Sequence, residues 1–212
     1  MDVMIYYTGW DGKNGSHRLL LEAAADWLRE QDRTDQIDAL ALMDPGTYQK
    51  PYFSSPSDIG FSISHSGNFW MCAFGRGELG LDVQGSQKCS PKRLAERFFH
   101  PKEAEWLERN GYRDFLQVWT AKESYLKYTG EGLTAGMDFF STADANGLRG
   151  QIRGAAQRHF WLTWSSKETG DRAAVCITGK TIGQIGWKQL DTSVEGTFKT
   201  RIGLEETEAG PV

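Results

Sequence analysis

The chain has 212 residues, 39% hydrophobic and 12% aromatic, so it can bury a sizeable core and is too apolar for a disordered protein. Its formal net charge of -4 gives no general basis for nucleic-acid binding, so any basic site must be local. No segment approaches the roughly 20 apolar residues of a membrane-spanning helix. Cys72, Cys89 and Cys176 are odd in number and lack metal-type spacing, which suits free thiols in a reducing compartment. We therefore expect a cytoplasmic protein.

The first part of the chain consists mainly of strand patterns, with one helix pattern. In chain order, we expect a strand over 3–7, a helix over 16–30 and strands over 61–63, 69–74 and 79–84. Ser16 is expected to cap the helix. The turn residues 75–78 predict that the last two strands form a hairpin.

The second part begins with three helical patterns and then becomes strand-like. Helices are expected to start at Ser90-Pro91, at His100-Pro101 and at Asp114, and strands are expected near 139–141, 148–152, 160–165 and 173–178. Asn146-Gly147 predicts a hairpin between the first two of these strands. Because strands occur in blocks without βαβ alternation, we predict an α+β fold with mostly antiparallel sheet.

Residues 80–84, Gly-Leu-Asp-Val-Gln, place two polar side chains on one face of a strand. Asp82 and Gln84 project together, since side chains alternate between faces. Such a pair is typical of the solvated face of a half-buried hairpin.

The predicted helix over 114–129 carries a lysine within its apolar stripe. The stripe consists of Phe115, Val118, Tyr125 and Leu126, with Trp119 beside it. Lys122 falls inside it and requires an anionic partner or a route to solvent, because burying an unpaired ammonium is costly. Glu123 lies at the edge of the stripe with Lys127 at i+4, which alone would indicate a surface ion pair without function.

The segment Ser62-Ile63-Ser64-His65-Ser66-Gly67 has two interpretations. Serines and a histidine at a strand end usually form a polar loop. They are also hydrogen-bond donors suited to an anion.

Together these residues resemble the Sfp-type 4'-phosphopantetheinyl transferases. The matching segments, in chain order, are His17-Arg18, Lys50-Pro51 (family G-K-P, with Gln49 replacing Gly), Ser62 to Ser66 (family ISHS), Gly80 to Val83 (family G-[IV]-D) and Trp119 to Lys127 (family [FW]-x-x-K-E-[SA]-x-x-K). Each motif alone is weak, but five in the family's order are specific. The resemblance covers roughly residues 16 to 178.

The resemblance implies a fold of two pseudo-twofold-related halves, each a small antiparallel sheet packed on a long helix. Residues 1–80 would form the N-terminal half with the coenzyme A phosphate contacts. Residues 81–190 would form the C-terminal half with the metal site, and residues 191–212 a polar mobile tail. The implied activity is Mg²⁺-dependent transfer of 4'-phosphopantetheine from coenzyme A to a serine of an acyl or peptidyl carrier protein, with release of 3',5'-ADP. The carrier, of fatty acid or secondary metabolite biosynthesis, is not specified by the sequence.

The resemblance also implies residue roles. Asp82, Gln84 and Glu123 would hold Mg²⁺, with Gln84 standing where many relatives carry a second strand acid. Glu123 would be the general base, directly or through a metal-bound water, and Lys127 would neutralise the departing phosphate. The implied coenzyme A contacts are Arg18, Lys50, Ser64, His65, Lys122 and Lys127.

A monomer is expected, with the carrier docking on the basic segment Lys88 to Lys102. The alternative for that segment is a surface helix whose charges only aid solubility. Two other functions remain open, a metal-dependent phosphohydrolase and a degenerate protein that binds coenzyme A or a carrier without catalysis.

Overall fold

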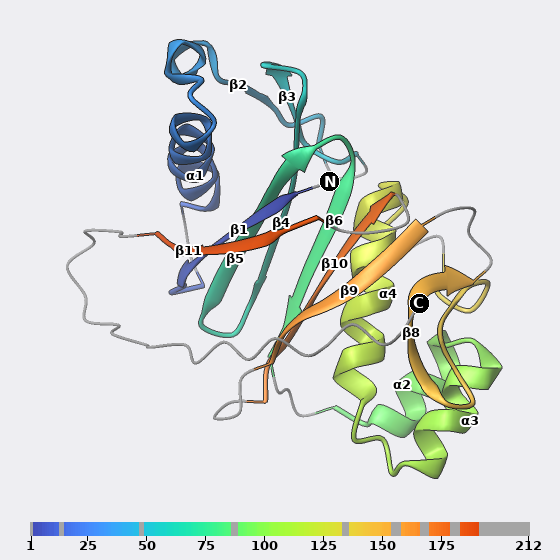
Figure 1. The fold of residues 1–212 in the computed structure, drawn as a ribbon. Helices are drawn as coiled ribbons and strands as arrows, with labels where there is room; N and C mark the ends of the chain where they lie inside the picture. The colour runs from blue at the N-terminus through green and yellow to red at the C-terminus, as the bar shows by residue number, and fades with distance from the viewer. Residues whose placement is uncertain are drawn as a thin grey trace.

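The computed structural model describes residues 2–12, 15–46, 49–85, 89–132, 136–153, 158–165, 170–178 and 183–190. The predicted α+β class is confirmed (Figure 1). The N-terminal elements are β1 (Val3–Gly9), α1 (Ser16–Glu30), the 3₁₀ helix η1 (Thr34–Ala39), β2 (Ala41–Met43), β3 (Tyr52–Ser55), β4 (Ile59–Ser66), β5 (Phe69–Arg76) and β6 (Leu79–Gln84). They are followed by α2 (Pro91–Phe98), α3 (Pro101–Arg109), α4 (Phe115–Thr129), β7 (Ser141–Asp144), β8 (Gly147–Arg153), β9 (Arg158–Ser165), β10 (Arg172–Thr178) and β11 (Ile185–Gln189).

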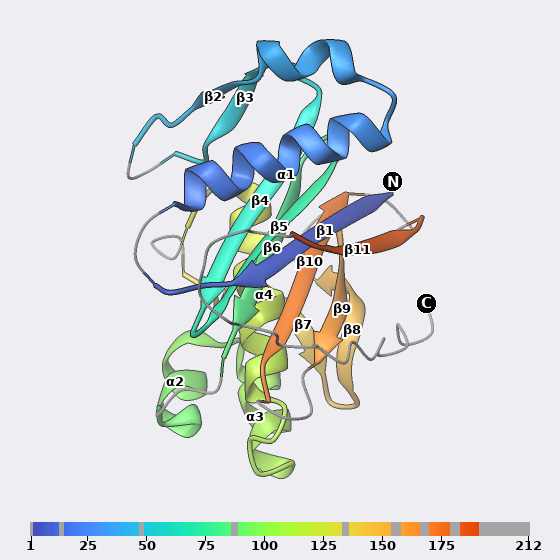
Figure 2. The ribbon, with the colours of Figure 1, turned by 90° about the vertical axis from the view of Figure 1, so that its left-hand side faces the viewer.

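Two sheets face each other between two helical layers (Figures 1 and 2). The strand orders are β11-β1-β5-β4 and β6-β10-β9-β8-β7, and β2 and β3 form a separate ribbon. Ile5 and Met71 of the first sheet pack on Leu81 and Val175 of the second. Helix α1 covers the outer face of the first sheet, and α4, helped by α2 and α3, covers that of the second. The layers are therefore α, β, β, α.

The predicted hairpin between β5 and β6 is wrong. Strand β6 pairs with β10, with Asp82 opposite Ala174. The reason is that both edges of β5 are already occupied, by β1 and β4. The hairpin predicted at Asn146-Gly147 is confirmed, since Asp144 of β7 pairs with Gly147 of β8.

Strands β2, β3 and β11 lie where the sequence pattern predicted none. Strand β11 pairs in parallel with β1, in the N-terminal sheet, although it falls within residues 81–190. Lys188 of β11 forms ion pairs with Asp26 (2.5 Å) and Glu30 (2.6 Å) of α1. The expected boundary at residue 80 lies inside β6. The predicted tail, residues 191–212, lies outside the described residues.

In the described part of the chain, none of the helices combines the length and apolar character needed to cross a membrane.

Gly80 allows α4 to lie directly on β6. A Cβ at this position would be 2.0 Å from the backbone oxygen of Ser124 and 2.4 Å from the backbone nitrogen of Tyr128. Backbone atoms of a packed helix cannot give way as a flexible side chain can. The contact therefore requires glycine for reasons of space.

We expect Gly80→Ala to lower the free energy of unfolding by about 3 kcal/mol, the upper part of the overpacking range, because α4 must move away from β6. Urea unfolding followed by circular dichroism measures the loss. Gly150→Ala is the matched control, since a Cβ there meets no atom within 4 Å. Equal stability of the two variants would contradict the close approach.

Candidate functional site

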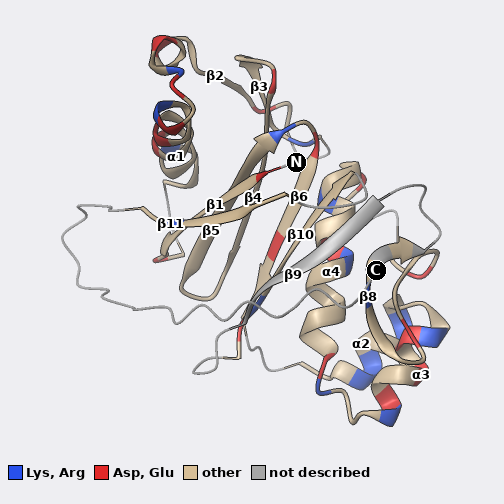
Figure 3. Cartoon of the chain, in the orientation of Figure 1, with Lys and Arg blue, Asp and Glu red and all other residues tan. Residues whose placement is uncertain are grey.

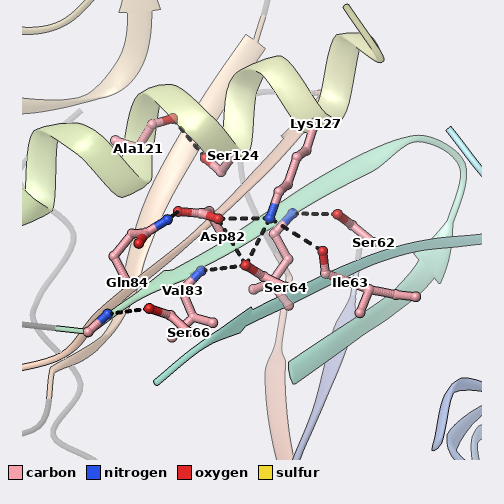
Figure 4. A network of polar contacts seen from close by, with 12 residues as sticks. Ser62, Ile63, Ser64, Ser66, Asp82, Val83, Gln84, Ala121, Ser124 and Lys127 are labelled. Atoms are coloured by element: carbon pink, nitrogen blue, oxygen red, sulfur yellow. Dashed lines mark hydrogen bonds and ion pairs between the residues drawn. The ribbon is translucent and has the colours of Figure 1, made fainter. Parts of the chain in front are cut away.

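Asp82 is the centre of a buried polar cluster between β4, β6 and α4 (Figure 4). The residue is 2% exposed. Its Oδ1 accepts from Lys127 Nζ at 2.7 Å and from Ser64 Oγ at 2.9 Å. Its Oδ2 accepts from Gln84 Nε2 at 3.2 Å, so Asp82 and Gln84 share a face, as their alternation predicts. Burial excludes the solvated-hairpin interpretation of Asp82.

Glu123 supplies a second buried carboxylate. It lies on α4 and is 9% exposed. Burial raises the pKa of Glu123 to about 7, with a further increase from the charge of Asp82 and a decrease from Lys127. Among the described residues, its carboxylate has no hydrogen bond or ion pair. Asp82 therefore has a direct ion pair with Lys127, whereas Glu123 is affected by the charge of Lys127 without contacting it.

Lys127 is bound to Asp82 and not to Glu123. Besides Asp82, its ammonium donates to Ser64 Oγ at 2.8 Å and to the carbonyl oxygen of Ile63 at 3.3 Å. These three bonds use all three of its donors. The simple i,i+4 surface pair with Glu123 is not formed in the described chain.

The segment Ser62 to Ser66 is part of strand β4, so the polar-loop interpretation is wrong. Its three serines are buried, and their hydroxyls accept from backbone N–H groups of β6 and of the residue after it (Figure 4). Ser62 accepts from Leu81, Ser64 from Val83 and Ser66 from Gly85, at 2.9, 3.0 and 2.9 Å.

Ser64 and His65 differ in their freedom to bind an anion. The Ser64 hydroxyl donates to Asp82 and accepts from Val83 and Lys127, so its one donor and two lone pairs are all used. His65 follows on the opposite side of the strand and is exposed. Its ring stacks on Trp10 with 5.4 Å between centroids. His65 therefore presents an accessible ring, whereas Ser64 would have to release a partner.

Lys122 is buried and bound to other groups of the protein, and its implied contact with a coenzyme A phosphate stays a prediction. It is 0% exposed, and its ammonium lies 2.6 Å from Glu103 Oε2 and 2.7 Å from the carbonyl oxygen of Phe140. Burial lowers the pKa of Lys122, and Glu103 opposes that shift. The anionic partner that the position requires is thus a glutamate of α3.

Glu103 is the important polar residue that the sequence reasoning missed. Its Oε1 accepts from the backbone N–H of Thr142 (2.5 Å) and of Ala143 (3.3 Å) and from the Thr142 hydroxyl (2.8 Å). Its Oε2 accepts from the His100 backbone N–H at 3.1 Å as part of a capping box. The sequence signal was this box, a glutamate at the third position of a helix.

Lys50 and Arg18 lie outside the Asp82 cluster. Lys50 binds Glu78 (2.9 Å) and the carbonyl oxygen of Leu79 (2.7 Å), and it lines a cavity of about 720 Å³ together with Tyr125 and other residues of α4. Arg18 forms an exposed ion pair with Glu22 at 2.9 Å. The structure therefore brings together Asp82, Gln84, Glu123, Lys127 and Ser64, with Lys50 on the neighbouring cavity.

The oxygen atoms of Asp82, Glu123 and Gln84 suit a hard divalent cation whose remaining ligands are supplied by water or substrate. Within the described residues, no three or more His, Cys, Asp or Glu side chains gather into a metal site. Asp82 and Glu123 interact closely enough for one to raise the pKa of the other. Mg²⁺ is typically held by one or two carboxylates plus phosphate oxygens and water, so two acids and the Gln84 amide fit it.

Comparison with known proteins finds similarity to one family over part of the chain. A model described as the 4'-phosphopantetheinyl transferase superfamily matches residues 78–178. A 4'-phosphopantetheinyl transferase of Bacillus subtilis is 36% identical over 100 residues, which are 44% of this chain and 43% of that protein. The 4'-phosphopantetheinyl transferase gsp of Aneurinibacillus migulanus is 37% identical over 90 residues, 41% of this chain and 37% of that protein. The 4'-phosphopantetheinyl transferase ffp of Bacillus subtilis is 36% identical over 137 residues, 61% of this chain and 59% of that protein. The chain spans about two fifths of the length of the first two relatives.

Proposed function

We propose, from its similarity to the 4'-phosphopantetheinyl transferase superfamily over residues 78–178, that the chain transfers 4'-phosphopantetheine from coenzyme A to a serine of an acyl or peptidyl carrier protein and releases 3',5'-ADP. The observation that carries the proposal is the cluster of Asp82, Glu123 and Lys127 within the matched region. Cleaving a pyrophosphate requires charge neutralisation on its oxygens and a base for the attacking hydroxyl. Two carboxylates and an ammonium in one buried cluster supply those groups.

Asp82 and Glu123 would hold Mg²⁺, and Gln84 would assist directly or through water. The cation, when bound, neutralises charge on the pyrophosphate. Glu123 would accept the proton of the carrier serine, directly or through water. Lys127, whose side chain is 31% exposed, would move from Asp82 to the departing phosphate.

His65 and Lys50 are the coenzyme A phosphate contacts that the geometry favours. His65 is exposed on the face of β4 opposite Ser64, and Lys50 lines the 720 Å³ cavity. Arg18 and Ser64 would first have to release Glu22 and Asp82, as Lys50 would have to release Glu78. Lys50 is the stronger candidate because it lines that cavity.

The carrier would dock on α2 and the start of α3. Lysines and arginines gather on these helices (Figure 3), and Lys92, Arg93, Arg97 and Lys102 are exposed. Lys92 lies 3.8 Å from Glu96 and 3.7 Å from Glu108, so part of this charge is offset. Lys88 lies outside the described residues. An acidic carrier surface would complement the remaining charge.

We also propose the pseudo-twofold arrangement and the monomeric state. The supporting observation for the first is that α1 and α4 each have 15 residues and each cover one sheet. The supporting observation for the second is that one chain contributes both carboxylates.

One experiment tests the activity against its two alternatives. The protein is incubated with an apo carrier domain, coenzyme A and Mg²⁺, and the intact mass of the carrier is measured. We expect the carrier to gain one phosphopantetheine. Cleavage of coenzyme A with an unchanged carrier would indicate a phosphohydrolase. Binding without either reaction would indicate a degenerate protein and end the transferase proposal.

We expect Gln84→Glu to tighten Mg²⁺ binding about tenfold, since the added negative charge attracts the cation while its repulsion of Asp82 offsets part of that gain. The new carboxylate would stand beside Asp82, which Gln84 contacts now. Without Mg²⁺ the same charge should lower Tm, and with Mg²⁺ the loss should reverse. Thermal unfolding at graded Mg²⁺ concentrations measures both effects. The exposed Gln189→Glu is the control, and an Mg²⁺ response no larger than in that control would place Gln84 outside the metal site.

A further inference from the structure

Strands β4 and β6 belong to different sheets and are joined by serine side chains. Ser62, Ser64 and Ser66 of β4 each accept a hydrogen bond from the residue 19 positions later along the chain. The three acceptor hydroxyls therefore form a regular row along the edge of β6. We call this row the serine seam.

The serine seam gives β6 the acceptors that a neighbouring strand would otherwise provide. One edge of β6 pairs with β10 through backbone bonds. On its other edge, the N–H groups of Leu81, Val83 and Gly85 are buried and need partners, because an orphaned buried donor is destabilising. Here hydroxyl oxygens replace the carbonyl oxygens of a regular ladder.

The serine seam contacts β6 on both sides of the candidate site residues Asp82 and Gln84. Ser62 holds the amide immediately before Asp82, and Ser66 holds the amide immediately after Gln84. Ser64, between them, binds both the Val83 amide and the Asp82 carboxylate. Ser62 and Ser66 thus fix the backbone on both sides of the acid through their contacts with main-chain amides.

We propose that Ser62 and Ser66 are positioning residues, which hold Asp82 in place against Lys127 and Glu123. The inference rests on the proposed function, since it assigns these serines to the same reaction. A serine hydroxyl can adjust its position by rotation about the Cα–Cβ bond, whereas a backbone carbonyl is fixed by the peptide plane. The seam therefore sets the position of β6 beneath α4, where Gly80 already permits close approach.

Ser62→Ala and Ser66→Ala remove single acceptors from the seam. We expect kcat to fall about tenfold in each, because a misplacement of about 1 Å in a reacting group costs up to a hundredfold. The KM for coenzyme A should stay within about twofold, since the contacts proposed for that substrate, His65 and Lys50, are not altered. Ser62→Thr and Ser66→Thr keep a hydroxyl and should restore most of kcat.

Ser16→Ala is the matched control. The Ser16 hydroxyl accepts from Trp70 Nε1 at 2.9 Å, in the N-terminal half and away from Asp82. Its loss also orphans a donor, so stability should fall as it does in the seam variants, while kcat stays unchanged. If Ser16→Ala and Ser62→Ala lose stability and kcat alike, the positioning role is overturned.

Amide hydrogen exchange gives a readout that does not depend on activity. In the wild type the Leu81 and Gly85 amides should be protected, and each should exchange about tenfold faster than the surrounding β6 amides when its serine becomes alanine, because it loses its acceptor. Site-specific loss of protection in a protein that modifies no carrier would support the seam and overturn the proposed function. Unprotected wild-type amides, or unchanged exchange in the variants, would overturn the seam whatever the activity.

Discussion

Replacing Glu123 by glutamine is expected to lower kcat for carrier modification by about a thousandfold, within the range that general base catalysis contributes. The amide keeps the shape of the side chain but can neither accept the proton of the carrier serine nor contribute charge toward Mg²⁺. Coenzyme A binding should remain measurable, because the proposed phosphate contacts are His65 and Lys50. Single-turnover mass spectrometry of the carrier and calorimetric titration with coenzyme A separate the two effects.

The same variant should remain folded. Burial and the neighbouring Asp82 disfavour the charged form of Glu123, so an uncharged amide removes an unfavourable interaction and Tm should not fall. Glu105→Gln, on the exposed side of α3, makes the same chemical change and should leave kcat unchanged. A rate within tenfold of the wild type would contradict the role assigned to Glu123. Loss of coenzyme A binding would instead reassign the residue to that substrate.

Short-range patterns predicted the parts of the site that lie on one element. Strand alternation placed Asp82 and Gln84 on one face, and they contact each other. Helical periodicity placed Phe115, Val118 and Leu126 in one buried stripe, as observed. These relations depend only on the period of the backbone, which is the same in every helix or strand.

The pairing of distant elements was not predictable in this way. The turn between β5 and β6 favoured a hairpin, but β5 had two other partners and β6 pairs with β10. The i,i+4 spacing alone indicated a pair between Lys127 and Glu123, whereas Lys127 binds Asp82, 45 residues earlier. Spacing along the sequence predicts only contacts within one helix or between adjacent strands. In a four-layer fold, the partner of a buried side chain can come from any part of the chain.

Lys122 is the clearest case. The sequence showed that the Lys122 ammonium, within the apolar stripe, needs an anionic partner. The family motif suggested only a coenzyme A phosphate for that partner. Glu103 lies 19 residues away on another helix and is 0% exposed, like the lysine it binds. A capping box marked Glu103 as a helix-start residue, but nothing in that pattern indicates burial.

Glu103→Ala is expected to lower the free energy of unfolding by about 3–5 kcal/mol, the cost of leaving one member of a buried ion pair without its partner. The substitution strands the Lys122 ammonium between Phe140 and Phe99 and removes the acceptor of the Thr142 N–H. Denaturant unfolding measures the loss. Glu105→Ala, on the exposed face of α3, should change stability by no more than about 0.5 kcal/mol. A loss below about 1 kcal/mol for Glu103→Ala would mean that the pair is not desolvated as the geometry indicates.

The double variant Glu103→Gln with Lys122→Met distinguishes the need for charge from the need for shape. Replacing a buried ion pair with uncharged groups of similar volume is often neutral, so the double variant should recover more than half of the loss. The introduced glutamine can still accept from Thr142, whereas the introduced methionine keeps the apolar stem of the lysine. The coenzyme A affinity of the folded double variant should equal that of the wild type, because Lys122 has no exposed surface. A drop in that affinity without a drop in stability would return Lys122 to the phosphate-binding role that its motif suggests. Unchanged affinity would leave this lysine as the anchor that holds α4, and with it Glu123, to the C-terminal core.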